Sequence, residues 1–370
     1  MKRLFYIANV RLPTEKAHGM QIMKSCEALA KTGLSVELLI PRRLNPLKAN
    51  PFEYYGVKHI FKITRLPVLD SVSCGRIGFW FETLVFLLIA RLYLWGRKGV
   101  VYTREEVVGI FFSKFVLETH MIPDHPGFFR RFIWRRARMH FVLTSFIKRK
   151  LIALGVPSQK IALAPDAVDL AQFDLACTKD QARQKVGFPQ DKKIVMYTGS
   201  FFLYDWKGVD VMLEAAKDFR NEVLFVLIGG SEREVNEAKH QWGRENIVFL
   251  GYRAPTEIPL YLKTADALII PNKKGTQVSE RYTSPLKLFE YMASGRPIIS
   301  SDLPSLREVV GDSEVVFFEP NNTADLSRAI RRVLGDASLA ERLSKNVRTR
   351  VGAFTWDVRM KTILQQLREL

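Results

Sequence analysis

The segment from Gln277 to Val310, QVSERYTSPLKLFEYMASGRPIISSDLPSLREVV, constrains the fold more than any other part of this chain. Ser284 before Pro285 predicts the start of a helix, because serine caps free N–H groups and proline is favoured at the first helical position. Gly295 predicts the end of that helix, and the apolar residues after Pro297 predict a buried strand. The sequence then predicts a turn into a second helix, capped by Ser305.

The helix predicted within this segment carries a carboxylate in largely apolar surroundings. One face of the helix is formed by Leu286, Phe289, Glu290 and Ala293. Burying an unpaired carboxylate is unfavourable, so Glu290 needs either sugar hydroxyls or a neighbouring Lys or Arg. The helix N-terminus offers N–H groups and the positive end of the helix dipole, which suit a phosphate. The segment therefore indicates either a nucleotide site or a structural ion pair.

The sequence of this segment resembles the nucleotide-binding signature of retaining glycosyltransferases of the GT-B fold, specifically those of the large family four. The shared pattern reads xPLKLxEaMA-xG-xPVVasD-xxxxxEvv. The resemblance implies an α/β protein with two Rossmann-like domains, whose parallel sheets face an interdomain cleft. It also implies that Glu290 binds the ribose of the donor. The family usually has a second glutamate eight positions earlier, facing the donor sugar, and Tyr282 occupies that position here.

The resemblance implies further donor contacts in the second half of the chain. Lys207 matches a lysine that contacts the diphosphate, although a surface lysine at a helix start is the alternative. Ser200 stands where the family has an arginine, and the backbone around Tyr252 would seat the base. The predicted donor-binding residues are Gly199, Ser200, Lys207, Tyr252, Arg253, Tyr282, Thr283, Ser284, Pro285, Leu286, Lys287 and Glu290.

The first half opens with a predicted β-α-β unit. Strand Leu4–Asn9 leads through the loop Arg11–Gly19 into helix Met20–Thr32, so the loop lies at the carboxyl end of a strand, where open α/β sheets bind ligands. The wording PTEKAHGxQIMKxCEALAKxG resembles the amino-terminal loop and helix of the same family. That resemblance places His18 and Gly19 at the catalytic cleft, whereas a capping or surface role is the alternative for His18.

A second candidate pair follows another predicted strand. Glu118 and His120 lie on one face of it, because side chains alternate along a strand. They match a Glu-x-His pair at the cleft of the resembled family, and a purely structural pair is the alternative. The predicted catalytic residues are His18, Gly19, Glu118 and His120, and none is an evident nucleophile. No DxD-like acidic pair lies in a suitable loop, so we expect no metal and no cofactor, only a UDP- or GDP-linked sugar as substrate.

Length and cysteine content bound the organisation of the chain. Its 370 residues predict two domains, which we place at 1–170 and 188–353. The last helix, at 354–370, resembles the closing helix of the same family, which crosses back onto the first domain. The three cysteines are widely spaced and predict reduced thiols. Met1-Lys2-Arg3 leads directly into a strand, so no signal peptide is expected. We expect a cytoplasmic protein, with peripheral attachment to the inner face of the membrane as an extension.

Positive charge is concentrated in the first half. Residues 1–168 contain 27 Lys and Arg against 11 Asp and Glu, whereas residues 169–370 contain 29 against 27. Such a surface predicts an anionic partner such as phospholipid, a phosphorylated acceptor or nucleic acid, and a merely solvated basic surface is the alternative. The strongest candidates lie on two predicted helices: Arg130, Arg131, Arg135, Arg136, Lys148, Arg149 and Lys150.

Residues 71–98 form the most apolar stretch. Glu82 and Arg91 interrupt it, and the longest apolar run is far shorter than the ~20 residues of a membrane span. We expect a buried helix of the first domain. The alternative is a helix at a membrane interface, anchored by Trp80, Tyr93 and Trp95.

The resemblance implies transfer of a hexosyl group from a nucleoside-diphosphate sugar with retention of configuration. The charge distribution adds the expectation of a membrane-proximal acceptor, a glycan or lipid-linked sugar. One alternative is a sugar-nucleotide epimerase of the same fold, which the motif SPLKLFEYMA disfavours. The other is a basic protein that binds nucleic acid or an anionic surface without catalysis. An aromatic-basic RNA-binding signature is absent, so nucleic acid is the less favoured partner.

Overall fold

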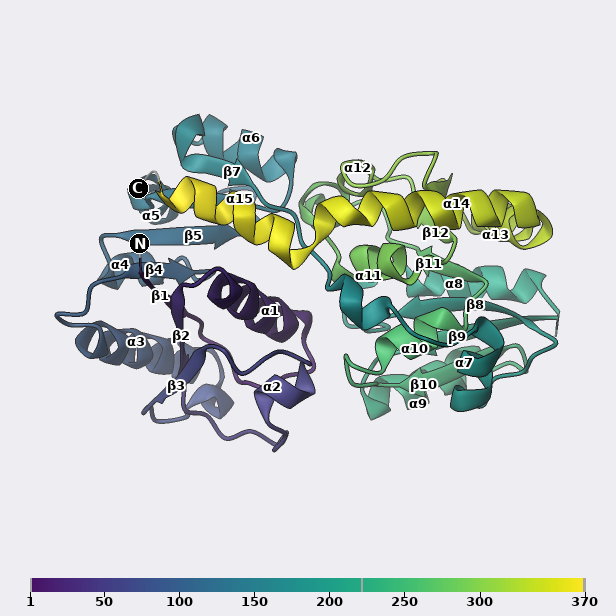
Figure 1. Ribbon diagram of the computed structural model, residues 1–370, viewed down its shortest axis with the longest axis horizontal. Helices are drawn as coiled ribbons and strands as arrows, with labels where there is room; N and C mark the ends of the chain where they lie inside the picture. Colours follow the sequence, from purple (N-terminus) through teal and green to yellow (C-terminus); the bar gives the residue numbers. More distant parts are fainter. Residues whose placement is uncertain (1, 221, 369–370) are drawn as a thin grey trace. The chain divides into compact units, whose positions relative to one another are not determined.

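The computed structural model describes residues 2–220 and 222–368 and contains two compact units. Unit 1 is made of the residues up to Pro165 together with those from Trp356 on, and unit 2 is Asp166–Thr355. The sequence predicts that the first domain ends at residue 170. The observed boundary between the units falls between Pro165 and Asp166, slightly earlier than predicted. Both units are α/β structures with parallel sheets, as the sequence predicts (Figure 1).

Unit 1 is built on a seven-stranded parallel sheet of order β3-β2-β1-β4-β5-β6-β7. The order reverses direction after β3, which brings the carboxyl ends of β1 and β4 side by side. Ligands of open α/β sheets bind at such a switch point. The strands are β1 Arg3–Ile7, β2 Ser35–Pro41, β3 Lys62–Leu66, β4 Val100–Thr103, β5 Phe115–Thr119, β6 Met139–Val142 and β7 Ile161–Leu163.

Helices cover both faces of this sheet. Right-handed crossovers place the helices that follow β3, β4 and β5 on the face opposite to the one covered by the first helix. The last helix packs against the first one, so the end of the described chain belongs to unit 1. The helices are α1 Ala17–Lys31, α2 Pro51–Tyr54, α3 Gly75–Tyr93, α4 Val108–Phe111, α5 Phe128–Arg136, α6 Ser145–Ala153 and α15 Trp356–Arg368.

Helix α3 differs from the sequence-based expectation of a buried helix. One face packs on the sheet through Phe86, Leu87 and Ala90, but the opposite face is exposed to solvent. Among the described residues, one helix, Val72–Tyr93, is long and apolar enough to cross a membrane, and only 28% of its apolar window is buried. The expectation was wrong for half of the helix, because apolar composition alone does not distinguish core packing from an apolar solvent-facing side.

Unit 2 has a six-stranded parallel sheet of order β10-β9-β8-β11-β12-β13. Its strands are β8 Lys193–Thr198, β9 Val223–Ile228, β10 Ile247–Gly251, β11 Ala267–Ile270, β12 Ile298–Ser301 and β13 Val315–Phe318. The helices are α7 Lys179–Val186, α8 Val209–Ala215, α9 Glu232–Trp242, α10 Ile258–Lys263, α11 Leu286–Ser294, α12 Pro304–Arg307, α13 Thr323–Gly335 and α14 Ala337–Arg350. Two apolar clusters, one on each face, fill the space between the central strands and these helices.

The segment that organises unit 2 folds largely as predicted, but neither serine caps its helix. Gly295 ends α11 with a φ of 64°, which a glycine adopts without strain. Ser284 does not cap α11: its Oγ accepts the backbone N–H of Asp166 at 3.1 Å. Ser305 lies inside α12 and donates to the carbonyl oxygen of Ser279 at 2.8 Å. Both cap predictions were wrong because long-range backbone partners take up the hydroxyl groups.

Candidate active site

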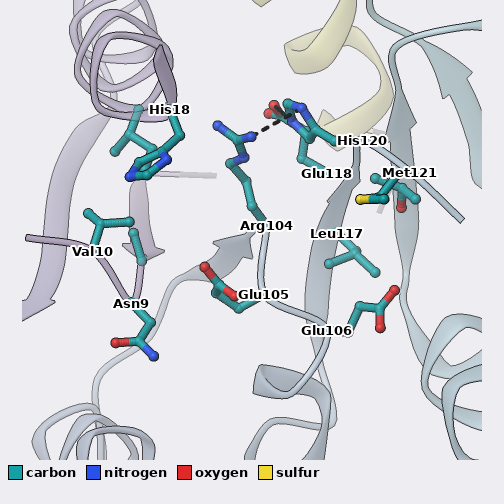
Figure 2. Close-up of a pocket in the computed structure, with 13 residues that line it drawn as sticks. Asn9, Val10, His18, Arg104, Glu105, Glu106, Leu117, Glu118, His120 and Met121 are labelled. Atoms are coloured by element: carbon teal, nitrogen blue, oxygen red, sulfur yellow. Dashed lines mark hydrogen bonds and ion pairs between the residues drawn. The ribbon is translucent and has the colours of Figure 1, made fainter. Parts of the chain in front are cut away.

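Unit 1 has a cavity of about 320 Å³ at the carboxyl ends of β1, β4 and β5. Three loops and one helix supply its walls, as expected for a switch point between neighbouring strands. Figure 2 shows Arg104 in the middle of the site, between His18 on one side and His120 on the other. The cavity therefore joins three of the four predicted catalytic positions, His18, Glu118 and His120.

Glu118 is the centre of a buried hydrogen-bond network at the end of β5. Its Oε1 atom accepts a hydrogen bond from His120 Nε2 at 2.6 Å and lies 3.1 Å from Arg359 Nη2 of α15. Tyr102 donates its hydroxyl to the other carboxylate oxygen at 2.5 Å. Both oxygens are engaged, so Glu118 is placed to orient His120 and not to attack a substrate.

Burial and charge fix the protonation states of this pair. Burial lowers the pKa of His120 to about 4, and Arg104 adds to that shift. Burial alone would raise the pKa of Glu118, but Arg359, the hydrogen bond from His120 and nearby Arg104 hold it well below its usual range. An ionised Glu118 thus accepts Nε2–H of a neutral imidazole. The Nδ1 atom is left to accept from Arg104 Nη2 at 3.1 Å.

His18 lies near the start of α1 and forms another part of the cavity wall. Burial lowers its pKa to about 4, with Arg104 and Lys16 adding to the shift. His18 is therefore neutral at physiological pH and can both donate and accept a hydrogen bond. These properties suit contact with a sugar hydroxyl, and they do not fit the alternative of an exposed surface histidine.

Gly19 has a packing function inside unit 1 and does not line the cavity. A Cβ atom on Gly19 would lie only 2.1 Å from the hydroxyl oxygen of Tyr55. That hydroxyl accepts the backbone N–H of Thr14 at 2.7 Å and donates to its carbonyl oxygen at 2.8 Å. Gly19 thus lets the loop before α1 close on Tyr55, and its predicted contact with substrate stays a prediction.

The sequence analysis missed the residues that complete this site. Arg104 directly follows β4 at the carboxyl edge, which is a usable signal, and it also donates to Gln21 Oε1 at 2.6 Å. Asn9 follows β1 in the same way and lines the cavity. Arg359 lies far away along the chain, and no local pattern marks it as a partner of Glu118.

Unit 2 contains a second candidate site, at the loops after β8 and β9. Gly199 has a φ of 134°, and a Cβ atom there would lie 2.9 Å from Lys287 Nζ. A Cβ atom on Gly229, which follows β9, would lie 2.2 Å from the carbonyl oxygen of Gly199. The absence of side chains at both positions lets the two loops touch and leaves backbone open to a ligand.

Two lysines approach the loop after β8. Lys207 Nζ donates to Ser200 Oγ at 2.6 Å, and burial lowers the pKa of Lys207 to about 8, with Glu234 opposing the shift. Lys287, at the start of α11, has its Nζ atom buried without a hydrogen-bond partner in the described part of the chain. Burial lowers its pKa well below the usual value, Lys207 adds to the shift and Glu290 opposes it. A buried cation without an acceptor indicates a place for an anion.

Glu290 lies one helical turn after Lys287 on α11. The residue is partly exposed, yet its carboxyl group is enclosed enough for burial to raise its pKa to about 7, while Lys287 opposes that shift. Within residues 2–220 and 222–368 the carboxylate makes neither a hydrogen bond nor an ion pair. This finding disfavours the structural ion pair that the sequence left open.

The other predicted donor residues surround this centre to different degrees. Tyr282 is buried at the end of the π-helical turn Val278–Tyr282. Arg253 is held by Tyr261, whose hydroxyl accepts its Nε–H at 3.0 Å, and by the carbonyl of the partly exposed Tyr252. Thr283 precedes α11, Pro285 occupies its N-cap position, and Leu286 is its first residue. The structure does not test their contacts with a nucleotide.

The basic residues that are predicted to contact an anionic surface lie on α5 and α6. Several of their side chains already have protein partners. Arg130 pairs with Glu106 at 2.9 Å and Lys150 with Asp124 at 3.3 Å. Arg131, Arg135 and Arg136 donate to backbone carbonyls, and Arg149 donates to Ser145. Lys148 is half-buried on α6. The cluster is nonetheless a basic surface, because the helix α5 itself contains no acidic residue.

Comparison with known proteins identifies the fold of these two units. The described chain resembles sucrose-phosphate synthase from Thermosynechococcus elongatus, with a TM-score of 0.80 and 19% identity over 100% of this chain and 99% of that one. It also resembles Anabaena HepE in complex with UDP and glucose, with a TM-score of 0.78 and 14% identity over all of both chains. The two parallel-sheet units thus define the GT-B fold of glycosyltransferases.

Within that class, residues 178–350 match the family described as glycosyl transferases group 1. Phosphatidyl-myo-inositol mannosyltransferase of Mycobacterium leprae is 28% identical over 213 residues, 56% of this chain and 54% of the relative. The putative colanic acid biosynthesis glycosyl transferase WcaI of Escherichia coli is 26% identical over 195 residues, 50% and 46% of the two chains. The chain spans about half the length of the curated relatives it matches. These relatives favour a transferase over the epimerase alternative.

Proposed function

We propose that this protein transfers a hexosyl group from a UDP- or GDP-linked sugar to a glycan or lipid-linked acceptor, with retention of configuration. The observation that carries the proposal is the buried ammonium group of Lys287, which lies beside the Gly199 loop and has no hydrogen-bond partner among the described residues. Lys207 and Glu290 lie close enough to shift its pKa. This combination of two cations, an open backbone loop and a free carboxylate suits a nucleoside diphosphate.

The chemistry of the proposed step follows from charge. When the bond between the sugar and the diphosphate breaks, negative charge develops on the departing phosphate. Lys207 and Lys287 would stabilise that charge in a site from which water is largely excluded. Glu290 would accept hydrogen bonds from the ribose hydroxyls, which anchors the nucleoside while the sugar is transferred. No metal ion is required by this arrangement.

The cavity of unit 1 is the proposed acceptor side. Neutral His18 would contact an acceptor hydroxyl, and His120 would hold Arg104 in position through its Nδ1 atom. Glu118 would act through His120 as a positioning residue, because its oxygens are already occupied. No side chain of this cavity is proposed as a covalent nucleophile.

Thermal unfolding in the presence of UDP, GDP and ADP, and of their sugar conjugates, tests the donor site. A ligand at ~100 times its dissociation constant stabilises a protein by about 2.7 kcal/mol, which is a measurable shift in Tm. We expect one diphosphate to stabilise the wild type selectively. Lys287→Met and Glu290→Gln should abolish or strongly reduce that shift, whereas Lys239→Met, at an exposed lysine of α9, should leave it unchanged.

A second measurement tests the stereochemistry. When no acceptor is supplied, water can take its place, and NMR can identify the anomer of the sugar that is released first. Retention predicts that this anomer has the configuration of the donor. Release of the opposite anomer would overturn retention, and the absence of any nucleotide response would overturn the transferase proposal itself.

A further inference from the structure

The exposed side of α3 carries an apolar stripe, which the exposed Arg91 interrupts near the end of the helix. Its members recur every three or four residues along the whole helix, so they lie on one face. The stripe consists of Ile77, Trp80, Phe81, Leu84, Leu88 and Leu92. Ile77 is 86% exposed and Trp80 is 50% exposed. A continuous group of such large apolar side chains on a surface that faces water is unusual.

Helix α5 carries a second group of exposed aromatic side chains. Phe128, Phe129 and Phe132 are all exposed, and Phe128 reaches 84%. Helix α4 packs against both α3 and α5, so the three helices form one layer on the same face of the sheet (Figure 1). We name the exposed apolar residues given above for α3 and α5 together the apolar surface.

Positive charges predominate around the apolar surface, where Arg130 pairs with Glu106 at 2.9 Å. Between residues 71 and 98 the single carboxylate is Glu82, which is fully buried and bonded to Arg43 at 2.6 Å. Arg76, Arg91, Arg130 and Arg131 are exposed on the same helices. Unit 1 as a whole has 30 Lys and Arg against 12 Asp and Glu, a net charge of +18, whereas unit 2 has 26 of each. A basic rim around exposed aromatic groups is complementary to anionic lipid headgroups over acyl chains.

Contacts on the buried side show that α3 would lie on a membrane and not cross it. Besides the Glu82–Arg43 pair, Thr83 Oγ1 accepts a hydrogen bond from Asn9 Nδ2 at 2.8 Å. Phe86 and Leu87 are completely buried against the rest of unit 1. Insertion of the whole helix would break these contacts and carry the side chains of Glu82 and Arg91 into hydrocarbon, which is costly.

The same contacts connect the apolar surface to the cavity of unit 1. Asn9 lines the cavity and is held by Thr83 of α3, while Arg43 links Asn9 Oδ1 to Glu82. Helices α3 and α5 both start at the carboxyl edge of the sheet, where the cavity also opens. The aromatic residues near the starts of both helices therefore lie towards the same edge of the sheet as the cavity.

We propose that the apolar surface docks unit 1 on an anionic lipid bilayer, with α3 and α5 lying in the plane of the headgroups and the cavity held beside the membrane. The inference goes beyond the proposed transfer, because docking needs no donor and can be measured without one. It also names the chemical class of acceptor that could reach the cavity directly, a sugar on a lipid anchor.

Sedimentation of the full chain with vesicles tests this proposal. We expect co-sedimentation with phosphatidylcholine vesicles that contain 30% phosphatidylglycerol, and little with pure phosphatidylcholine. The doubles Trp80→Gln/Phe81→Gln and Phe128→Ser/Phe129→Ser should each lower the partition coefficient by about tenfold or more. Ile152→Gln is the matched control, because Ile152 is an exposed apolar residue near the end of α6, outside the apolar surface.

Each variant is also checked for its unfolding temperature and for stabilisation by UDP, both of which should stay at the wild-type values. Failure of docking is thereby separated from failure of the proposed donor site. The proposal is overturned if the wild type does not bind anionic vesicles, or if both doubles bind as well as the wild type. It is also overturned if the chain is a dimer that the doubles convert to a monomer, since the surface would then be a protein interface.

Discussion

The ammonium group of Lys287 lies 3.7 Å from the centre of the Tyr197 ring, inside unit 2. A desolvated cation–π contact stabilises by roughly 2 kcal/mol, whereas an unpaired buried charge costs several kcal/mol. The aromatic ring therefore compensates only part of the cost of burying Lys287. A diphosphate between Lys287 and Lys207 would supply the missing counter-charge, which makes ligand binding and folded-state stability depend on the same side chain.

Replacement of Lys287 by methionine should separate these two effects. Methionine keeps the aliphatic volume and removes the buried charge, so we expect the unliganded protein to keep its free energy of unfolding or gain about 1 kcal/mol. Affinity for the nucleoside diphosphate should fall by about tenfold or more. Urea unfolding and calorimetric titration measure the two quantities. A loss of stability in the unliganded variant would mean that Lys287 is structural.

Nucleotide affinity should have a maximum between pH 7 and pH 8. Burial raises the pKa of Glu290 to about 7, so its carboxylate form, which accepts ribose hydroxyls, is lost as the pH falls through that value. Burial lowers the pKa of Lys207 to about 8, so its positive charge is lost as the pH rises through that value. Calorimetric titration with UDP from pH 6 to pH 9 checks both limbs.

The variant Glu290→Gln is the control for the acidic limb. The phosphate of UDP itself titrates near pH 6, and it does so equally with wild type and variant. The difference between the two profiles therefore reports on Glu290 alone. If the acidic limb is the same in both proteins, Glu290 does not bind the ribose.

Local signals predicted much of the fold, and they failed where a distant residue decides the outcome. Gly295 ended α11 as predicted, because a glycine after an apolar helix is a local property. Ser284 did not cap that helix, because its hydroxyl oxygen accepts the backbone N–H of Asp166 instead. The role of Arg359 could not be predicted either, since its partner Glu118 is brought to it only by tertiary folding.

The candidate site shows the same division. The alternation of Glu118 and His120 on a strand predicted their contact, which the 2.6 Å hydrogen bond confirms. The sequence could not reveal that Lys287 is buried without a partner, because burial depends on how the Gly199 loop packs. Nor could composition predict that half of α3 is exposed, because an apolar helix has the same composition in a core and on a surface.

Glu118 should be important for stability as well as for positioning His120. Removal of one partner of a buried ion pair typically costs about 3–5 kcal/mol, so we expect a loss of this size for Glu118→Ala in urea unfolding at pH 7. Its pKa is lowered in the folded state, so its stabilising effect is present above its unfolded pKa of about 4.3. The effect is lost as the pH falls further, through the folded value.

Glu15→Ala is the matched comparison for this prediction. Glu15 pairs with Arg11 at 3.6 Å on the surface, and exposed pairs of this kind contribute about 0–1 kcal/mol. The difference in unfolding free energy between wild type and Glu118→Ala should be undiminished at pH 5. A gap that closes already between pH 7 and pH 5 would contradict the lowered pKa.

Gly19 and Tyr55 should be energetically coupled. Gly19→Ala would place a methyl group against the Tyr55 hydroxyl and should destabilise unit 1 by about 1–3 kcal/mol through overpacking. Tyr55→Phe removes the hydroxyl and its bonds to Thr14. In a double-mutant cycle of unfolding free energies, the double variant should be more stable than the sum of the two single effects. Additive effects would show that the close approach carries no strain.

The ion pair between Glu118 and Arg359 has a consequence for the order of biosynthesis. Glu118 is made early, but the arginine that neutralises it follows only after all of unit 2, Asp166–Thr355, has been translated. While the ribosome is still adding unit 2, the interior of unit 1 holds a carboxylate without its cationic partner. Unit 1 can therefore complete this buried ion pair only after the whole of unit 2 has been translated.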